Sequence, residues 1–178
     1  MTPLRAPLQE GAVLLLPLTE MHREGLRAAC AADPDIWAIY PVNMNGGDFD
    51  REFDAILAHP ARVAFAALLD GAVVGTSSYL SPAPADRAVE IGGTYIAPAV
   101  RGTGFNRVMK RLMIDHAIAC GFRRIEFRVD TRNKRSMAAV AKLGATLEGV
   151  LRRNRVTWTG YARDTAVYSL LAEERQAP

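Results

Sequence analysis

The stretch "VRGTGFNRVMKRL", residues 100–112, joins a turn containing two glycines to an apolar-periodic segment. Apolar residues recur there at three- and four-residue spacings, which predicts a helix from about Gly104 to Cys120, with Gly121 suited to its C′ position. A helix N-terminus leaves about four backbone N–H groups without acceptors and carries partial positive charge. Gly102 and Gly104 would let the backbone approach an anion closely. The stretch therefore indicates either a phosphate-binding turn or a flexible turn before a surface helix.

Four cations lie in and after this turn, and they divide into two groups. Arg101 and Arg107 flank the glycines and are candidates for contact with phosphate, whereas Lys110 and Arg111 are expected on a solvated helix face. The pattern departs from the Walker motif because no Gly-Lys-Ser/Thr follows, and from the dinucleotide fingerprint because the third glycine is missing. The turn alone does not distinguish the two interpretations.

The segments around the turn alternate between strand and helix patterns. "AVEIGGTYIAP" (88–98) is a strand whose paired glycines, Gly92 and Gly93, mark a bulge or a close backbone approach. Asp70-Gly71 joins two apolar strands in a hairpin. This pattern predicts an α/β fold, a mixed sheet in a single layer with helices on both faces. The expected order is a strand at 12–18, helices at about 20–32 and 50–59, the hairpin, the strand at 88–98, the helix at 104–120, a strand at 123–130, a helix from 133 to 144, and two or three strands up to 171.

Length and composition are those of one globular domain. The 178 residues are 49% hydrophobic and 23% charged, and we expect a single domain over 1–178 with its core at about 11–172 and short flexible tails. No apolar run approaches the ~18 residues that a membrane span needs. Cys30 and Cys120 have no metal-ligand spacing and are expected as buried free thiols, which suits a cytoplasmic protein.

The net charge of +3 hides an uneven distribution. Residues 1–100 hold 6 Lys/Arg against 12 Asp/Glu, whereas residues 101–178 hold 16 against 7. This is either chance clustering, or a basic half that meets a polyanion and an acidic half that meets a cation. Acidic residues interrupt the basic half and no recognition motif for nucleic acid is present, so no nucleic-acid partner is expected.

The strand at 88–98, the turn "AVRGTGFN", the helix after it, the next strand and "NKRSMAAVAKLGA" together resemble the GCN5-related N-acetyltransferase (GNAT) family. The family signature Gln/Arg-x-x-Gly-x-Gly/Ala is matched by residues 101–106, with Asn106 departing at the last position. The "RGTG-x-N" form and the ending "LGATLEGVLRRN…ARDTAVYSLL" are similar to the RimJ/RimL-type branch, which acetylates ribosomal-protein N-termini and small amines. The resemblance covers about residues 14–171. It implies a mixed, mostly antiparallel central sheet of six or seven strands, splayed by a bulge.

The resemblance also implies acetyl-CoA as a co-substrate, with no metal. The pyrophosphate of acetyl-CoA would lie on the backbone amides of the turn, and the pantetheine arm would bond to backbone near Ile96. The distortion at Gly92-Gly93 would then serve cofactor entry, unless it is a simple packing bulge. Asn133 matches a position that often contacts pantetheine, although a plain N-cap role would also explain it. The residues implied for cofactor binding are Ile96, Arg101, Gly102, Thr103, Gly104, Phe105, Asn106, Arg107 and Asn133.

Acetyl transfer to an amine needs a base for the amine and stabilisation of the leaving thiolate. Glu90 matches the carboxylate of histone-acetylating members, and burial in its apolar strand would raise its pKa; otherwise it is a half-exposed residue paired with an arginine. Glu126 on the neighbouring strand is a second candidate. Val140 occupies the position where many relatives place the acidic tyrosine. Ser136 resembles the serine that the ribosomal branch uses near the sulfur, unless it is an ordinary first-turn serine; a water or Tyr95 are the other options for the acid.

The acceptor pocket is expected between the loop "IWAIYPVNMN" (36–45) and nearby strand ends. The acidic first half of the chain would favour a cationic acceptor. Arg155 replaces a carboxylate that the RimJ/RimL-type branch carries, which counts against a ribosomal-protein substrate. The predicted pocket residues are Trp37, Tyr40, Asn43, Thr94 and Trp158, with Trp37 equally suited to the core.

The sequence therefore predicts a cytoplasmic, bacterial-type N-acetyltransferase that transfers acetyl to a primary amine by direct attack, without a covalent enzyme intermediate. The leading acceptor is a small amine, an amino acid or an antibiotic-like molecule. Protein N-terminal acetylation of the ribosomal type is the alternative, and a non-catalytic CoA-binding regulatory protein is the alternative of another class. The expected partner is the small-molecule or peptide amine, with no membrane; a homodimer is compatible with the family.

Overall fold

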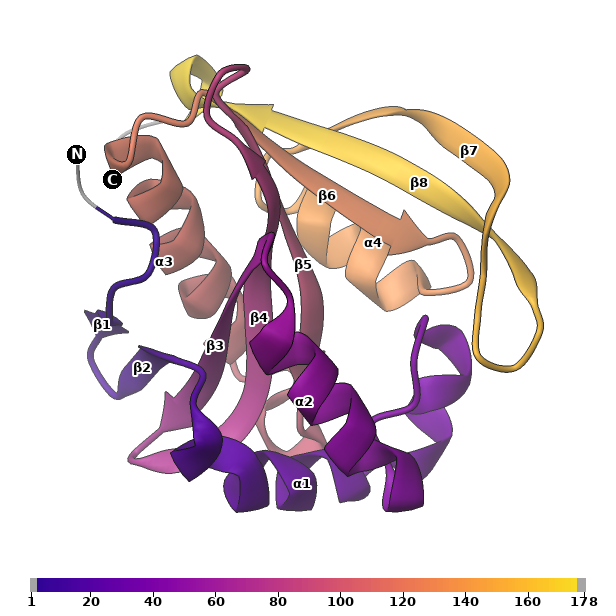
Figure 1. Ribbon diagram of the computed structural model, residues 1–178. Coiled ribbons are helices and arrows are strands. Elements are labelled where there is room, and N and C mark those ends of the chain that lie inside the picture. The colour runs from indigo at the N-terminus through magenta and orange to yellow at the C-terminus, as the bar shows by residue number, and fades with distance from the viewer. Residues whose placement is uncertain (1–2, 176–178) are drawn as a thin grey trace.

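Eight strands form one sheet in the computed structural model, which describes residues 3–175. Their order across the sheet is β1-β2-β3-β4-β5-β6-β8-β7, and every neighbouring pair is antiparallel except β5 and β6 (Figure 1). The strands are β1 (Leu8–Glu10), β2 (Val13–Pro17), β3 (Arg62–Leu69), β4 (Ala72–Ala83), β5 (Ala88–Ile96), β6 (Arg124–Asp130), β7 (Thr146–Val156) and β8 (Ala162–Leu171).

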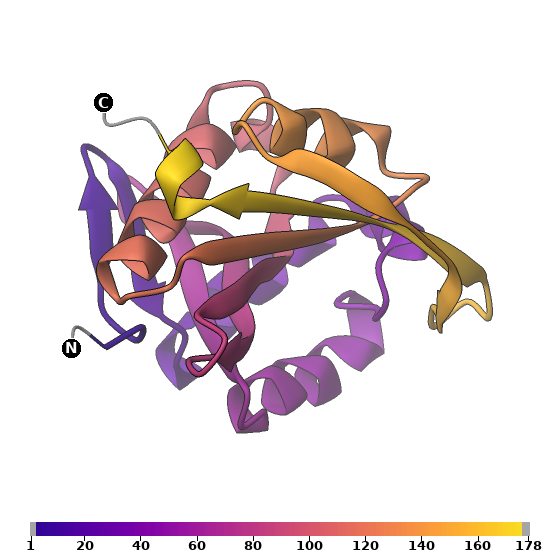
Figure 2. The same cartoon turned by 90° about the horizontal axis from the view of Figure 1, so that it is seen from above.

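Helices cover both faces of the sheet because each helix buries one apolar side. Seen from above, α3 and α4 lie on one side and α2 on the other (Figure 2). The helices are α1 (Arg23–Ala31), α2 (Phe49–Ala58), α3 (Phe105–Ala119) and α4 (Lys134–Ala141). Short 3₁₀ helices occupy Glu20–His22, Pro34–Ile39 (η2), Gly46–Asp48, Pro98–Val100 and Ala172–Glu174.

The parallel pair β5–β6 is short and then opens. Only Ala88–Glu90 of β5 pairs with Arg124–Glu126 of β6, and the two strands diverge beyond these residues (Figure 1). The crossover through α3 makes the pair parallel, as βαβ connections do. Beyond Glu90, the edge of β5 that faces β6 therefore has no strand partner.

An extra residue in β5 reverses the face on which its side chains lie. The β4–β5 register shifts between Thr76 and Ser78, which pair with Tyr95 and Gly92. Strict alternation would place Ile91 and Tyr95 on the same face, but they belong to the two opposite cores. Gly93 adopts a φ of +57°, where glycine is favoured. The bulge predicted from the glycine pair is confirmed.

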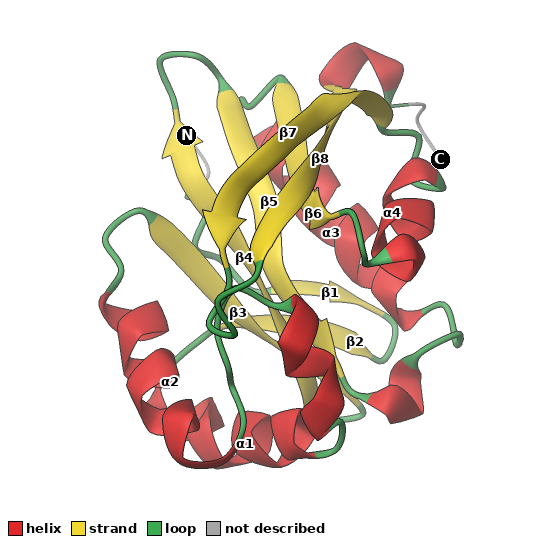
Figure 3. Ribbon diagram, turned by 90° about the vertical axis from the view of Figure 1, so that its right-hand side faces the viewer, coloured by secondary structure: helices red, strands yellow, loops and turns green. Residues whose placement is uncertain are grey.

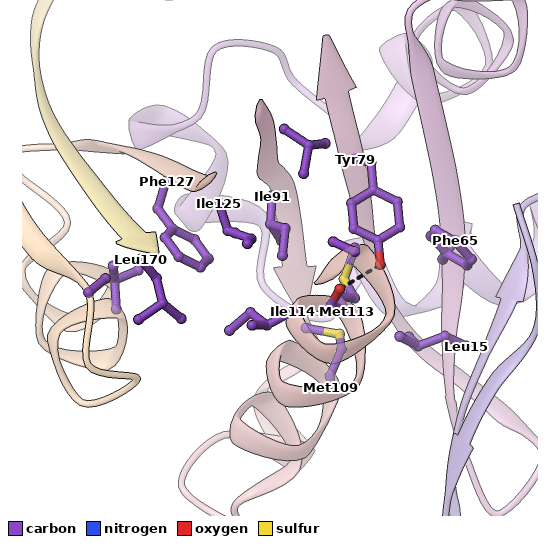
Figure 4. Close-up of a cluster of buried hydrophobic side chains, with 14 of the residues drawn as sticks. Leu15, Phe65, Tyr79, Ile91, Met109, Met113, Ile114, Ile125, Phe127 and Leu170 are labelled. Carbon is purple, nitrogen blue, oxygen red and sulfur yellow. Dashed lines mark hydrogen bonds between the residues drawn. The ribbon is translucent and has the colours of Figure 1, made fainter. Parts of the chain in front are cut away.

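Two hydrophobic cores lie on the two sides of the sheet. The core beneath α3 and α4 is anchored by Tyr79, whose hydroxyl donates to Met113 O at 2.7 Å (Figure 4). The core beneath α1 and α2 is anchored by Tyr95, whose hydroxyl donates to Ala29 O at 2.6 Å. Each tyrosine thus fixes a helix to the sheet through a buried carbonyl, and the two faces of the sheet are held separately.

The α/β fold with helices on both faces is confirmed, with two differences in detail. The sheet has eight strands rather than six or seven, because β1 pairs with β2 as an added edge strand. The segment 36–45, predicted as a loop, begins within η2. The Asp70-Gly71 hairpin and the two buried free cysteines are confirmed. No helix within residues 3–175 is long and apolar enough to cross a membrane, and the single-domain boundary stays a prediction.

Gly75 in β4 offers a test of the packing between β4 and the end of β5. A Cβ at Gly75 would overlap Tyr95 O, a backbone atom that cannot move aside. Gly75→Ala is therefore expected to lower the free energy of unfolding by about 1–3 kcal/mol, measured by urea denaturation. Gly149→Ala in β7 is the control because a Cβ there meets no atom within 4 Å. Equal stabilities of the two variants would contradict this packing.

Candidate functional site

The turn before α3 presents a row of free backbone N–H groups. Gly102 and Gly104 adopt φ values of +79° and +91°, which a residue with a side chain rarely adopts. Thr103 Oγ1 donates to Val100 O at 2.8 Å and stiffens the turn. We call these N–H groups the amide cradle. Among residues 3–175 no acceptor takes the N–H groups of Gly102, Thr103, Gly104, Asn106 and Arg107.

Arg101 does not face the cradle, although it was expected to flank a phosphate. Its Nε donates to Ile96 O at 3.1 Å, and its Nη1 forms an ion pair with Asp33. Arg101 thereby braces the turn against the end of β5 and the start of η2. Arg107 is exposed on the first turn of α3, where its side chain remains available to an anion. Phe105 is buried in the core and contributes to the turn through its packing.

The opened edge of β5 leads from the cradle into the sheet. Ala97 N donates to Val74 O of β4, so the alternation along the strand directs the N–H of Ile96 away from β4, toward the gap beside β6. Tyr40 Oη donates to Thr94 O at 2.9 Å on the same edge. The backbone of Ile96 therefore offers a donor where the sequence predicted a contact with an extended ligand.

The N-terminus of α4 faces the same end of the sheet as that of α3. Each helix follows one strand of the parallel pair, so both begin at the carboxyl ends of these strands, where ligands of α/β sheets bind. Asn133 caps α4: its Oδ1 accepts from Ser136 N at 3.0 Å. The hydroxyl of Ser136 is half-buried and bonds to no group within residues 3–175. Asn133 is thus an N-cap, and Ser136 keeps a free donor.

Glu90 lies where β5 and β6 part, as the last residue of β5 that pairs with β6. Burial raises the pKa of its carboxyl above the usual range, and Arg128, whose Nε is 3.6 Å from Glu90 Oε2, opposes this rise. Glu126 is held more tightly, by Arg124 at 2.8 Å and by Arg128 at 3.3 Å. Of the two predicted carboxylates, Glu90 is the less tightly paired with arginine.

The predicted acceptor residues separate into packing groups and exposed ones. Trp37 is 1% exposed and stacks on Tyr95 with 4.7 Å between ring centroids, so it belongs to the core rather than to a pocket wall. Asn43 is tied to its own loop, since its Nδ2 donates to Asp48 Oδ2 at 2.9 Å. Trp158 is 49% exposed and donates through Nε1 to Trp37 O at 2.7 Å.

Trp158 joins the β7–β8 hairpin to η2 and the segment after it. Trp158 N also donates to Pro41 O at 3.1 Å, so the tip of the β7–β8 hairpin rests on the segment after η2 (Figure 3). The hairpin and this segment come from opposite ends of the chain. They meet next to the half-buried Tyr40, whose hydroxyl bonds to Thr94 O on the opened edge of β5.

Lys110 was expected in solvent, but it is 5% exposed. Its Nζ donates to Thr94 Oγ1 at 2.5 Å and to Ser77 Oγ at 3.2 Å, beneath the bulge of β5. Burial lowers the pKa of Lys110 to about 7, and the charge of Glu90 acts in the opposite direction. Thr94 therefore turns its hydroxyl toward α3 and offers only its backbone to the predicted pocket. Arg111, in contrast, lies at the surface and pairs with Glu10.

The helical periodicity already contained the signal for Lys110. Residues 110, 113, 114 and 117 are spaced as one face of a helix, and all four are buried. Lys110 was expected on a solvated face because it lies further along the helix from the glycine turn, although it belongs to this buried row. Tyr95 is likewise removed from the candidate acids, because it is buried with its hydroxyl on Ala29 O and burial raises its pKa to about 12.

Residues 12–146 match the family model described as an acetyltransferase (GNAT) domain. A putative acetyltransferase from T. thermophilus has a TM-score of 0.89 and 31% identity, with 98% of this chain and 93% of that chain covered. A probable acetyltransferase (GNAT family) from Chromobacterium violaceum has a TM-score of 0.89 and 30% identity, with 97% and 89% covered.

RimJ of Mycobacterium smegmatis, solved in complex with CoA-disulfide, shares the fold at a TM-score of 0.81 and 24% identity, with 97% of this chain and 88% of that chain covered. No curated protein matches the chain.

Replacing Lys110 tests its buried state through the pH dependence of stability. An unfolded lysine titrates near 10.5 and the folded one near 7, so between these values the unfolded chain holds one more proton and stability rises with pH. The slope reaches about 1.4 kcal/mol per pH unit. Lys110→Met is expected to remove this slope, measured by urea denaturation between pH 7 and 9.5.

Lys142→Met, at an exposed position after α4, serves as the control and should keep the slope. If Lys110→Met retained the pH dependence of the parent protein, the buried ammonium would not be its source.

Proposed function

The chain belongs to the acetyltransferase (GNAT) family, and we propose that it transfers acetyl from acetyl-CoA to a small primary amine by direct attack of that amine. Acetyl transfer itself follows from family membership. The observation that carries the proposal is the amide cradle standing beside the unpaired edge of β5, with Glu90 where that edge begins.

The residues of the cradle fit the diphosphate of CoA. Five free N–H groups at the start of a fifteen-residue helix suit an anion, and both glycines leave the backbone open to it. Arg107 would add a cation, and Ile96 would bind the amide groups of the pantetheine arm through its N–H. Acetyl-CoA supplies the acyl group already activated as a thioester.

Glu90 would take the proton that the attacking amine must lose. Its raised pKa brings the carboxylate closer to the pH at which the enzyme operates, which is what a general base requires. Ser136, at the N-terminus of α4, would donate to the leaving sulfur, and the partial positive charge of the helix end would favour the thiolate. The position where many relatives place a tyrosine is occupied by Val140, which is buried and has no proton to donate.

Two observations favour a small acceptor over a protein N-terminus. The β7–β8 hairpin is joined through Trp158 to the segment after η2, and Tyr40 of this segment bonds to the opened edge of β5. Arg155 stands on β7 where the resembled branch carries a carboxylate. A cytoplasmic location and a homodimer stay predictions of the sequence.

The cradle is tested by Gly104→Val. The valine would both strain a left-handed backbone and stand where the diphosphate approaches, so we expect CoA affinity to fall at least about 10-fold, measured by calorimetric titration. Gly121→Val is the matched control, because Gly121 has a φ of +94° at the other end of α3. CoA affinity equally unchanged in both variants would refute the cradle.

The base is tested by Glu90→Gln. For the parent protein, kcat/KM should fall as the pH drops through the raised pKa of Glu90, since the protonated carboxyl cannot accept a proton. The variant should lose about 10²-fold or more in rate together with this acidic limb, measured as thiol release from acetyl-CoA over a pH series.

Glu126→Gln should keep the fall of kcat/KM at low pH, because the carboxylate of Glu126 is engaged in ion pairs with Arg124 and Arg128. A pH profile of Glu90→Gln identical to that of the parent would clear Glu90 of the role. CoA binding without thiol release, over a panel of amines and N-terminal peptides, would instead support a regulatory protein.

A further inference from the structure

The sheet face that bears Glu90 also bears three arginines without a carboxylate partner. On β5, Val89 and Ile91 point into the core beneath α3, so Glu90 between them points to the opposite face. Residues paired across strands share a face, and the row that runs from Glu90 through Leu80 reaches Arg62 on β3. We call this the acceptor face.

Arg62 lies against the bulge of β5. Its Nε donates to Ser78 Oγ at 2.8 Å, and a Cβ on Gly93 would lie 2.6 Å from its Nη2. No carboxylate oxygen of residues 3–175 lies within 4.0 Å of its guanidinium, and burial lowers its pKa to about 10. Gly93 thus leaves room for the guanidinium of Arg62, which forms no ion pair with a carboxylate of the described residues.

Arg163 and Arg155 carry the same excess charge on the other side of the opening. Arg163 is 6% exposed, bonds through Nε to Thr165 Oγ1 at 3.1 Å, and alternates with the core residue Ala166 and its neighbours, which places it on the acceptor face. Arg155 is its direct partner in the β7–β8 register. Neither forms an ion pair within the described part of the chain, although the buried carboxylate of Asp130, which is paired with Arg132, also favours the charged form of Arg163. Both lie near enough to Glu90 for their charge to oppose the rise of its pKa.

A buried cation without an ion pair, such as Arg163, and like charges in register, such as Arg155 and Arg163, both cost stability, so their retention needs a cause. The acidic first half of the chain does not supply the missing partners. On the outer surface, Arg23 and Arg27 bind the carboxylates of Glu20, Glu24, Asp50 and Asp54, and Arg51 binds those of Asp48 and Glu52. A cationic acceptor was expected from the acidic first half of the chain, but these carboxylates are bound by arginines on the outer surface.

We propose that the acceptor is an amine that also carries an oxyanion, a carboxylate or a phosphate, and that Arg155 and Arg163 bind this oxyanion while the amine lies at Glu90. Guanidinium groups bind both oxyanions through paired, charge-assisted hydrogen bonds. The inference rests on the proposed acetyl transfer and names the class of its acceptor.

Matched acceptors test the inference. Thiol release from acetyl-CoA is measured with glycine against glycinamide, and with 2-aminoethyl phosphate against ethanolamine. We expect kcat/KM to be at least about 10-fold higher for the acidic member of one pair. The pair that responds identifies the oxyanion as carboxylate or phosphate. The amine of glycinamide is less basic than that of glycine, so its larger neutral fraction works against the expected result.

Variants then locate the oxyanion. Arg62→Gln, on β3 and four strand positions from Arg163, should keep the ratio of kcat/KM between acidic and neutral acceptors, whereas Arg163→Gln should reduce that ratio toward one. Arg155→Gln, at an exposed position, should act in the same direction and guards against loss of folding at the buried sites. Arg152→Gln, an exposed arginine of the same strand β7, is the charge-matched control and should keep the ratio.

The two failures are distinct. Turnover with equal or better rates on neutral or cationic amines would overturn the oxyanion inference and leave the acetyltransferase intact. A ratio that survives in both Arg155→Gln and Arg163→Gln would also overturn it. Absence of thiol release with every amine, despite CoA binding, would overturn the proposed function and this inference with it.

Discussion

The separation of β5 from β6 after three paired residues sets the position of every other part of the site. Backbone groups inside a sheet are normally paired, so an opened edge is available only where two strands are forced apart. Here the bulge at Gly93 turns the rest of β5 away, and the N–H of Ile96 faces the gap. Helices α3 and α4 both begin beside this gap, because each follows one strand of the parallel pair.

The opening also explains why charge is distributed unevenly between the surface and the site. On the outer surface arginines and carboxylates pair with each other, as Arg23 does with three acidic side chains. On the sheet face that bears Glu90, Arg62 and Arg163 form no ion pair among the described residues, and Glu90 itself is half-buried. Such a site gains electrostatic interactions only when a ligand brings the opposite charge.

Local patterns were enough to predict the parts of the site that are made of backbone. The turn at 101–106, the glycine bulge and the helix after it depend on residues adjacent in the chain, where the left-handed conformations need glycine. Side-chain directions were predicted less well. Trp37 went to the core, Arg101 turned to Asp33, and Lys110 was buried beneath Thr94. Each of these outcomes depends on a partner that lies far away in sequence.

The sequence by itself determined the order of strands and helices from β2 onward, the glycine turn before α3, and the placement of Glu90 in an apolar strand. These follow from periodicity and from backbone conformations that act over a few residues. Only the tertiary structure decided which charges meet. Arg62 and Arg163 are about a hundred residues apart in the chain, and they share one face because the sheet register aligns their strands on both sides of Glu90. Coulomb interactions depend on distance in space, and the sequence does not contain that distance.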